Sequence, residues 1–162
     1  MAAAGVDSVE HGMCLDPDAL AGMAERGMAL TPTLSRIQAV LQRARQWPEG
    51  PRKQWYVRGA EAHERLVAAA AEAGVTVLAD TDDRPHGRVA DEVRALAAAG
   101  IPAHDALAAA SWFARAYLGL PGLEPGAPAD AVVYATDPRL DLKQLNAPAA
   151  VILRGQCVRG PR

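Results

Sequence analysis

The chain has 162 residues, 50% of them hydrophobic, and a formal net charge of −2. A chain of this length buries one sizeable core but not two comfortable domains. The Lys and Arg residues are scattered, which argues against a nucleic-acid partner. No apolar run approaches the roughly 20 residues that span a bilayer, and the first residues lack the basic and apolar regions of a signal peptide. We therefore expect a cytoplasmic protein with no membrane partner.

The first three-quarters of the chain predict alternating strands and helices. The helix after the first strand shows its signals clearly, with Asp16 as N-cap, Pro17 at the first helical position and Gly27 at the end. This alternation is typical of parallel strands joined by helical crossovers. We expect strands at 5–11, 28–34 and 75–82, and helices at 16–27, 59–74, 87–100 and 102–120.

Residues 35–58 are harder to assign. Their first part, SRIQAVLQRARQW, is compatible with a helix, whereas WPEGPRKQW contains two prolines and a glycine. Prolines and glycines in this number favour a loop or an excursion from the α/β pattern.

Beyond residue 121 the sequence changes character. A turn-rich connector, PGLEPGAPAD, precedes a predicted strand, AVVYAT, and a predicted hairpin around Arg154 and Gly155. We therefore expect two parts, an α/β part at 1–121 and a β appendage at 122–162.

The cysteines do not form a recognisable pair. Cys14 and Cys157 lie near opposite ends of the chain, without a CxxC spacing. Free thiols are the expected state in a cytoplasmic protein, and a disulfide or a thiolate metal site is the alternative.

Side chains that can bind metal follow two of the predicted strands. His11 ends the first strand, and Asp80 and Asp82 end the third, within the polar segment DTDDRPHG that also contains His86. Ligands gather at the carboxyl ends of parallel strands. Imidazole and carboxylate are ordinary Zn²⁺ ligands, and a carboxylate beside a metal-bound water can accept its proton.

Each of these residues also has a purely structural interpretation. A lone histidine after a strand, such as His11, is often a capping or core hydrogen-bonding group, and Asp83 is a candidate cap for the following helix. His63 and His104 are expected on solvent-compatible helix faces without a functional role. The tryptophans are expected to be core or interface anchors; they are Trp47, Trp55 and Trp112.

Six segments follow one another along the chain: AGVDSVEHG, LTPTL, AGVTVLADTD with PHG, DEVRALAAAGIPAHDALAAAS with ARAYLGL, LEPGAPADAVVYATDP and PAAVILRGQCV. In this order they resemble the carboxyl-terminal half of the amidohydrolase superfamily, especially its imidazolonepropionase-like and prolidase-like members. The resemblance covers nearly the whole chain and is weakest at 35–58.

The resemblance implies an α/β fold. The chain would supply strands six to eight of a metal-dependent (β/α)8 TIM barrel, with their helices, and part of a small carboxyl-terminal β-sandwich. It further implies a small-molecule substrate, hydrolysis of carbon–nitrogen bonds and a divalent metal, usually Zn²⁺.

The same resemblance assigns roles to individual residues. His11 and Asp82 match metal ligands, and Asp82 is also the catalytic residue that takes the proton of the attacking water. His86 matches a residue of the loop after strand eight, with substrate contact as its role. Asp80 stands where the family usually has a small residue, which makes it a candidate accessory carboxylate. The segment AASWFARAY also departs from the family pattern.

The sequence lacks the HxH strand, the strand-four lysine or carboxylate and the strand-five histidine of the family. A complete barrel needs about 250 residues, and a catalytic zinc typically keeps three protein ligands. Three hypotheses follow. The chain is a hydrolase by descent, or a truncated or split-gene fragment that is inert alone or completes a barrel with a complementary N-terminal half chain, or a homo-oligomer that pairs two half-barrels.

Overall fold

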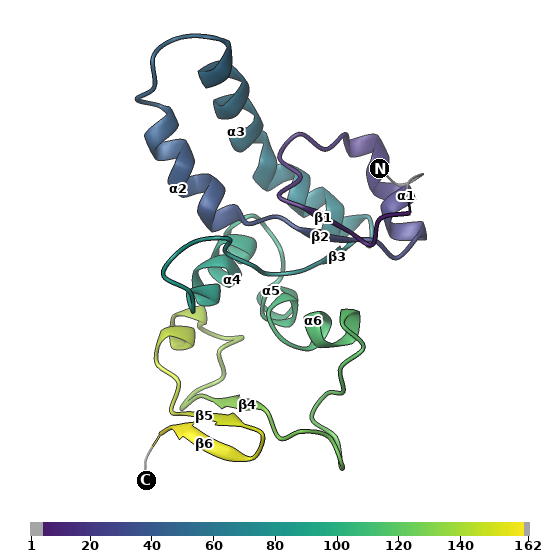
Figure 1. The fold of residues 1–162 in the computed structure, drawn as a ribbon, viewed down its shortest axis with the longest axis vertical. Coiled ribbons are helices and arrows are strands. Elements are labelled where there is room, and N and C mark those ends of the chain that lie inside the picture. Colours follow the sequence, from purple (N-terminus) through teal and green to yellow (C-terminus); the bar gives the residue numbers. More distant parts are fainter. Residues whose placement is uncertain (1–4, 161–162) are drawn as a thin grey trace.

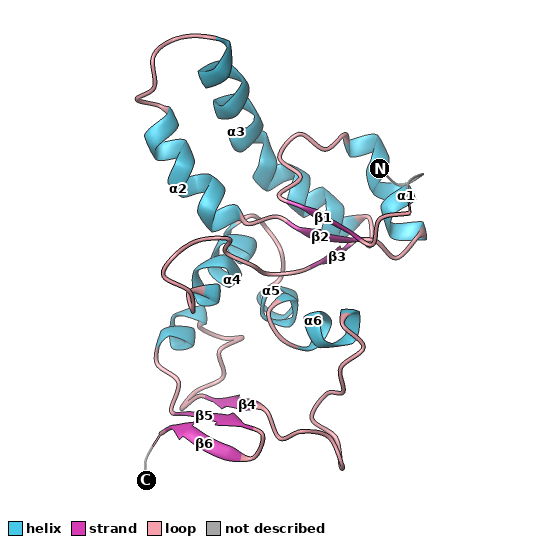
Figure 2. Ribbon diagram, in the orientation of Figure 1, coloured by secondary structure: helices cyan, strands magenta, loops and turns pink. Residues whose placement is uncertain are grey.

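The computed structural model describes residues 5–160, and within them it shows an α/β protein with two sheets (Figure 2). Figure 1 shows the parallel sheet in the middle of the molecule, with the α2–α3 pair projecting on one side and the antiparallel sheet at the opposite end. The strands are β1 (Ser8–Glu10), β2 (Ala29–Thr31), β3 (Thr76–Val77), β4 (Ala131–Val133), β5 (Ala150–Leu153) and β6 (Gln156–Arg159). The α-helices are α1 (Leu20–Glu25), α2 (Leu34–Ala44), α3 (Pro51–Glu72), α4 (Val89–Ala98), α5 (Ala103–Ala109) and α6 (Trp112–Tyr117), and 3-10 helices span Pro17–Ala19 and Leu142–Asn146.

The first sheet has the order β1-β2-β3, and both pairings are parallel. Helix α1 connects β1 to β2, and α2 with α3 connects β2 to β3, so the predicted helical crossovers are confirmed. The third strand is shorter than expected. The Leu78 amide still donates to the Leu30 carbonyl at 2.9 Å, but the Ala79 amide donates to Ala109 of α5 at 3.0 Å. The chain therefore leaves the sheet before Asp80 and Asp82.

The segment WPEGPRKQW, residues 47–55, is a loop only as far as Gly50, so the expected loop was wrong from Pro51 onward. Helix α3 begins at Pro51, directly after Gly50, and continues through the predicted helix to Glu72. Proline lacks an N–H that the first helical position would leave unpaired in any case, so Pro51 starts this helix instead of breaking it.

The predicted helix at 102–120 is two helices. Between α5 and α6 the Ser111 hydroxyl donates to the Leu107 carbonyl at 2.6 Å, and the Ser111 backbone is not helical. A serine that bonds backward in this way competes with the backbone ladder and often bends or ends a helix.

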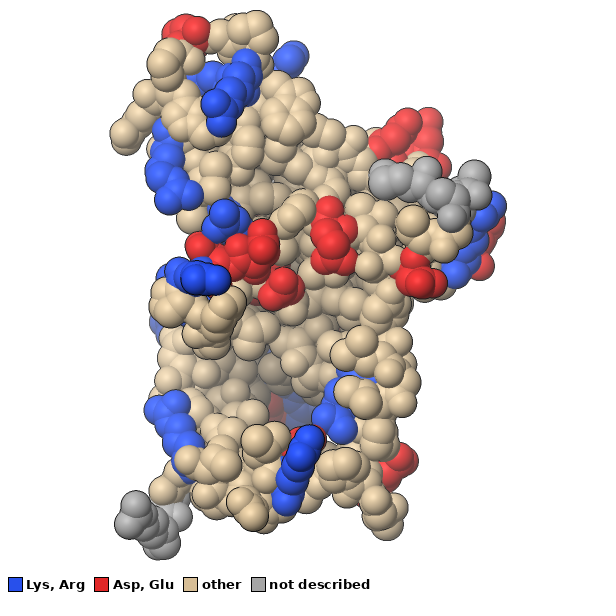
Figure 3. All heavy atoms as spheres, viewed as in Figure 1, with Lys and Arg blue, Asp and Glu red and all other residues tan. Residues whose placement is uncertain are grey.

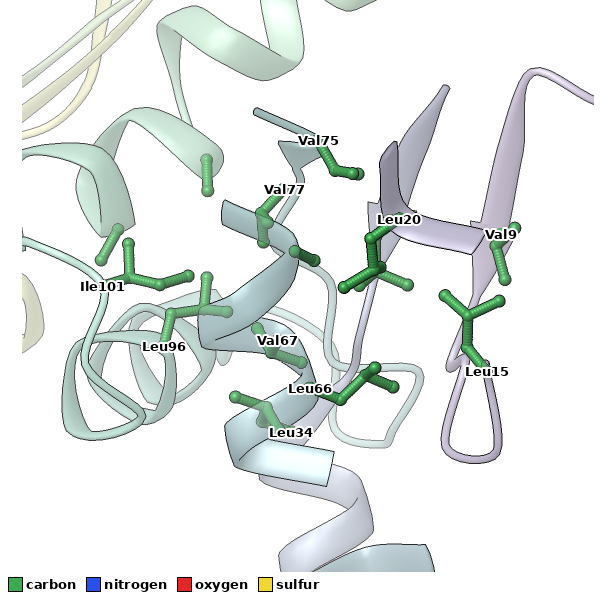
Figure 4. Close-up of a cluster of buried hydrophobic side chains, with 14 of the residues drawn as sticks. Val9, Leu15, Leu20, Leu34, Leu66, Val67, Val75, Val77, Leu96 and Ile101 are labelled. Carbon is green, nitrogen blue, oxygen red and sulfur yellow. The ribbon is translucent and has the colours of Figure 1, made fainter. Parts of the chain in front are cut away.

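The main core lies between the parallel sheet and its helices (Figure 4). Leu30 of β2, Val67 of α3 and Leu96 of α4 are fully buried in it. A second, smaller cluster of Ile37, Leu41 and Ala60 joins α2 to α3. The tryptophans do not act as core anchors in the way expected, because Trp55 and Trp112 are exposed; Trp47 is half-buried beside Tyr56.

The second sheet is antiparallel, with the order β4-β5-β6. The predicted hairpin turn is present, and both Arg154 and Gly155 have positive φ, as a tight two-residue hairpin requires. Leu142 and Leu145 of the 3-10 helix pack against the main core, and Arg94 of α4 donates to Asn146 at 3.2 Å. The boundary near residue 121 stays a prediction.

The structure also describes the state of the two cysteines and the length of the helices. Cys14 and Cys157 are free and exposed, which confirms the expected thiols. Across residues 5–160, none of the helices is long and apolar enough to cross a membrane.

Gly12 allows the chain to turn tightly against β2 directly after His11. Its φ is +67°, and a Cβ built there would lie 2.9 Å from Leu30 Cδ1, a side chain that is fully buried. Gly27 has nearly the same φ of +65°, but a Cβ there would meet nothing within 4 Å. The two glycines therefore share a backbone conformation and differ in the space around them.

We predict that Gly12→Ala lowers the free energy of unfolding more than Gly27→Ala. Both variants carry a left-handed alanine, which costs about 1–2 kcal/mol, and Gly12→Ala adds overpacking against Leu30, which costs about 1–3 kcal/mol more. Urea denaturation of both variants measures the difference. Equal losses would contradict the close approach of Gly12 to Leu30.

Candidate functional site

Each of the three parallel strands is followed by a residue with left-handed backbone geometry. These residues are His11 (φ 63°), Thr33 (φ 49°) and Asp82 (φ 42°), and Arg154 in the hairpin turn is the other non-glycine residue of positive φ among residues 5–160. Such geometry is uncommon for non-glycine residues and is a genuine outlier for a β-branched one such as Thr33. Strained residues that cluster in this way are typical of functional sites.

His11 is oriented by contacts on both ring nitrogens. Its Nδ1 lies 2.7 Å from the Thr33 hydroxyl, and its Nε2 lies 3.8 Å from Oδ2 of Asp82. The side chains of His11 and Asp82 are 50% and 55% exposed, so both reach solvent. The segments that follow the three strands thus meet in one contact chain.

Arg36, from the first turns of α2, joins this group. Its guanidinium lies 3.6 Å from Oδ2 of Asp82 through Nε and 2.9 Å from Oδ1 of Asp83 through Nη1. Asp83 also accepts the Arg84 amide at 2.8 Å, whereas α4 begins after Arg88 without a side-chain cap. The interpretation of Asp83 as a helix cap was therefore wrong, because its carboxylate is turned toward Arg36. Figure 3 shows acidic and basic side chains gathered across the middle of the molecule, level with the parallel sheet.

A pocket of about 350 Å³ opens beside His11 and Asp82. Apart from Arg36 and these two residues, its lining is apolar or aromatic and comes from the loop after β1 and from the α2–α3 pair: Met13, Cys14, Ile37, Val40, Trp55 and Tyr56. The pocket therefore combines a charged end with an apolar wall.

The other two predicted site residues lie apart from this pocket. His86 is exposed in the loop between β3 and α4, and Asp80 is exposed at the start of that loop. Neither is among the residues that line the pocket. The charge of Asp80 acts instead on Glu92, whose pKa it helps to raise.

Glu92 is a buried charged residue that sequence reasoning missed. It lies in the first turn of α4 and is fully buried, and its two carboxylate oxygens accept the amides of Leu34 at 2.7 Å and Ser35 at 2.8 Å. Burial raises the pKa of Glu92, and the hydrogen bonds from Ser35 and Leu34 oppose that shift. No local pattern signals this contact, because its partners lie 58 and 57 residues away.

His63 was wrongly expected on a solvent-compatible face. It is fully buried on α3, and its Nε2 lies 3.0 Å from the Pro32 carbonyl oxygen. Because a carbonyl only accepts, Nε2 carries the proton. Nδ1 has no hydrogen-bond partner among the residues that the structure describes. Burial lowers the pKa of His63, which keeps the ring neutral, while the bond to Pro32 opposes that shift.

The donor set of the site fits a metal only in part. An imidazole Nε2 and a carboxylate oxygen 3.8 Å apart are suitable for sharing one ion, since two ligand atoms about 2.1 Å from a tetrahedral zinc lie about 3.4 Å apart. The Thr33 hydroxyl on Nδ1 gives His11 the kind of partner that orients metal-binding histidines. Within residues 5–160, however, no group of three or more His, Cys, Asp or Glu side chains is placed to hold a metal.

Comparison with known proteins decides the ancestry of this site. The family model described as "Amidohydrolase family" matches residues 1–159. The chain belongs to the amidohydrolase family. Members of this family are generally metal-dependent, and the resemblance inferred from the order of segments is confirmed.

The curated relatives are longer proteins. An uncharacterized protein of Mycobacterium tuberculosis and one of Mycobacterium bovis are each 45% identical to the chain over 161 residues, with 94% of this chain covered. The match covers 42% of each relative, so this amidohydrolase chain spans less than half of their length.

Solved structures of similar proteins share the fold. A Xaa-Pro dipeptidase with bound methionine superimposes with a TM-score of 0.86 at 27% identity, covering 98% of this chain and 41% of that one. A putative prolidase from Bifidobacterium longum gives 0.83 at 30% identity, with 99% and 44% covered. The A. niger ochratoxinase gives 0.81 at 27% identity, with 99% and 39% covered.

We predict that His63 makes the folded amidohydrolase chain less stable at acidic pH. Burial lowers the pKa of His63 in the folded chain below its ordinary value of 6.5, so below about pH 6.5 the unfolded chain binds a proton that the folded chain does not. The free energy of unfolding therefore falls as the pH falls through this range, by at most about 1.4 kcal/mol per pH unit for one proton.

Urea denaturation between pH 8 and pH 5.5 tests this contribution. His63→Gln removes the titrating ring, so its slope should be smaller than that of the unsubstituted chain. His104→Gln changes an exposed histidine and serves as the matched control, with the original slope expected. Identical slopes for the chain with and without His63 would refute the assignment.

Proposed function

We propose that this chain forms strands six to eight of a (β/α)8 amidohydrolase barrel, with residues 122–162 as part of a small β-sandwich. Three parallel strands in consecutive order, each followed by helix, support the barrel segment. The antiparallel sheet β4-β5-β6 supports the second part. The barrel is a hydrolase of carbon–nitrogen bonds.

The observation that carries the proposal is the convergence of His11 and Asp82, whose Nε2 and Oδ2 lie 3.8 Å apart in the loops after two of the proposed barrel strands. These two residues would hold a divalent metal, with Zn²⁺ the best match to imidazole and carboxylate ligands. A bound metal of this kind polarises the substrate and makes a bound water more acidic. The remaining ligands come from segments beyond the 42% of the relatives that this chain spans, in one polypeptide or in a complementary chain.

The residues around the metal ligands have distinct tasks. Asp82 is the catalytic residue that accepts a proton from the attacking water, and the Arg36 guanidinium lies 3.6 Å from its Oδ2. Thr33 orients the His11 ring through Nδ1. His86 remains our candidate for substrate contact from its exposed loop, and Asp80 our candidate accessory carboxylate.

The pocket favours a substrate with an apolar group next to the bond that is cleaved. Ile37, Val40, Trp55 and Tyr56 form the apolar wall opposite the charged end. Among the similar structures are a Xaa-Pro dipeptidase with bound methionine and a prolidase complexed with N-methylphosphonate-L-proline. Dipeptides of the Xaa-Pro type and N-acyl amino acids are therefore the substrates to test first.

We predict that the chain binds Zn²⁺ through His11 and Asp82. Isothermal titration calorimetry should show that His11→Ala and Asp82→Asn each weaken binding by on the order of tenfold or more, because even partners of metal ligands contribute that much. His104→Ala removes an exposed histidine outside the pocket and should leave the affinity unchanged. If all three variants bound Zn²⁺ as tightly as the unsubstituted chain, this metal site would be rejected.

Hydrolysis assays distinguish an independent enzyme from a fragment. Metal-dependent turnover by the chain alone, abolished by Asp82→Ala, would support an independent hydrolase. Turnover that requires co-expression with the remaining segment of the M. tuberculosis relative would support a fragment that completes a barrel. Absence of turnover in both experiments would reject hydrolysis of the tested bonds.

A further inference from the structure

The turn after β2 is held in an unfavourable conformation. Thr33 has φ 49° and ψ 45°, although its side chain is β-branched, and it is nearly fully buried. It is also the N-cap residue of α2, but its hydroxyl makes no capping hydrogen bond. That hydroxyl contacts His11 Nδ1 instead, at 2.7 Å. Contacts from outside the turn must therefore hold the backbone and satisfy the start of the helix.

Glu92 supplies the cap from another helix. Its carboxylate accepts the amides of Leu34 and Ser35, the first two residues of α2. A threonine at an N-cap normally accepts such a bond itself. Because Glu92 takes over this role, the Thr33 hydroxyl is free to contact His11.

His63 holds the other side of the same turn. It extends from α3 and donates from Nε2 to the Pro32 carbonyl, one residue before Thr33. Its ring is completely buried, so the contact is shielded from water. The turn is thus held from α3 on one side and from α4 on the other.

We propose that His63 and Glu92 are positioning residues, which together hold the turn at 32–35 so that the Thr33 hydroxyl accepts a hydrogen bond from Nδ1 of His11. At 3.8 Å the Asp82 carboxylate lies beyond hydrogen-bond distance of Nε2, whereas the Thr33 hydroxyl lies 2.7 Å from Nδ1. The tautomer with the proton on Nδ1 therefore leaves the lone pair of Nε2 on the side of Asp82. This inference rests on the proposed function, because the reason to keep the Nε2 lone pair free is that a metal binds a neutral nitrogen through it. The hydrogen bond between Thr33 and His11 is nevertheless present without a metal.

The competing interpretation is that the two buried side chains stabilise the fold and nothing more. Both interpretations predict that substitution destabilises the protein. They differ over His11, because only the positioning role predicts that changes in α3 and α4 alter the tautomer of an exposed ring in another loop.

Proton–nitrogen correlation spectra of the imidazole rings of the metal-free chain, at a fixed pH where His11 is neutral, report the tautomer directly. The chain itself should show a protonated Nδ1 on His11. Thr33→Val removes the hydroxyl at nearly constant shape and should shift His11 toward the Nε2-protonated form, whereas Thr33→Ser should retain the original signature.

The variants His63→Leu and Glu92→Gln test the positioning residues. Each should shift His11 in the same direction as Thr33→Val, and His63→Gln, which keeps an N–H donor for Pro32, should restore part of the original signature. The matched controls are Leu66→Ala on α3 and Leu96→Ala on α4, which open the same core but remove no hydrogen bond to the turn. Both controls should keep the Nδ1-protonated form.

Controls that shift His11 as strongly as His63→Leu and Glu92→Gln would overturn the proposal, as would an unchanged His11 in both of those variants. If His63→Leu does not fold, the comparison of Glu92→Gln with Leu96→Ala decides alone. The failure of Zn²⁺ binding in calorimetry would reject the proposed metal site and leave the tautomer result standing. An altered tautomer in the controls would reject positioning even if Zn²⁺ binds.

Discussion

The hydrogen bonds from the Leu34 and Ser35 amides to the Glu92 carboxylate are the interaction on which the rest of this site depends. A fully buried carboxylate is costly unless hydrogen bonds satisfy it, and the start of a buried helix is costly unless acceptors satisfy its amides. The Glu92 carboxylate and the first two amides of α2 therefore satisfy each other's hydrogen-bonding needs. The contact joins the helix after the second strand to the helix after the third, and it therefore determines where the ends of those two strands lie relative to each other.

Left-handed residues at the ends of the strands are a consequence of that arrangement. The chain must turn sharply at His11, Thr33 and Asp82 to pass from the sheet into the following loop or helix while presenting each side chain to the same space. The middle strand β2 is buried along its whole length, and this packing helps to offset the local cost. The same turns bring an imidazole, a hydroxyl and a carboxylate into contact, with Arg36 added from the helix that Glu92 caps.

The α2–α3 pair supplies the apolar side of the pocket. A small cluster of Ile37, Leu41 and Ala60 joins the two helices, and Leu34 and Val67 anchor them in the main core. Its aromatic residues Trp55 and Tyr56 line the pocket together with His11 and Asp82. This is also the region where the sequence resembles the family least. The polar end of the site is thus built on the segments that follow the parallel strands, whereas the apolar wall is built on the α2–α3 pair and the loop after β1.

The sequence by itself determined the α/β character, the parallel crossovers, the amidohydrolase ancestry and the candidates His11 and Asp82. Hydrophobic periodicity and the order of segments can be seen along the chain without knowing which residues meet in space. The roles of Thr33, Arg36, His63 and Glu92 were decided only by the tertiary structure. His63 and Glu92 lie on helices whose sequence pattern is also compatible with solvent, and their partners are separated from them by 31 and 58 residues. Periodicity carries no information about such contacts, since they exist only when packing brings the turn after β2 between two helices that follow it in the chain.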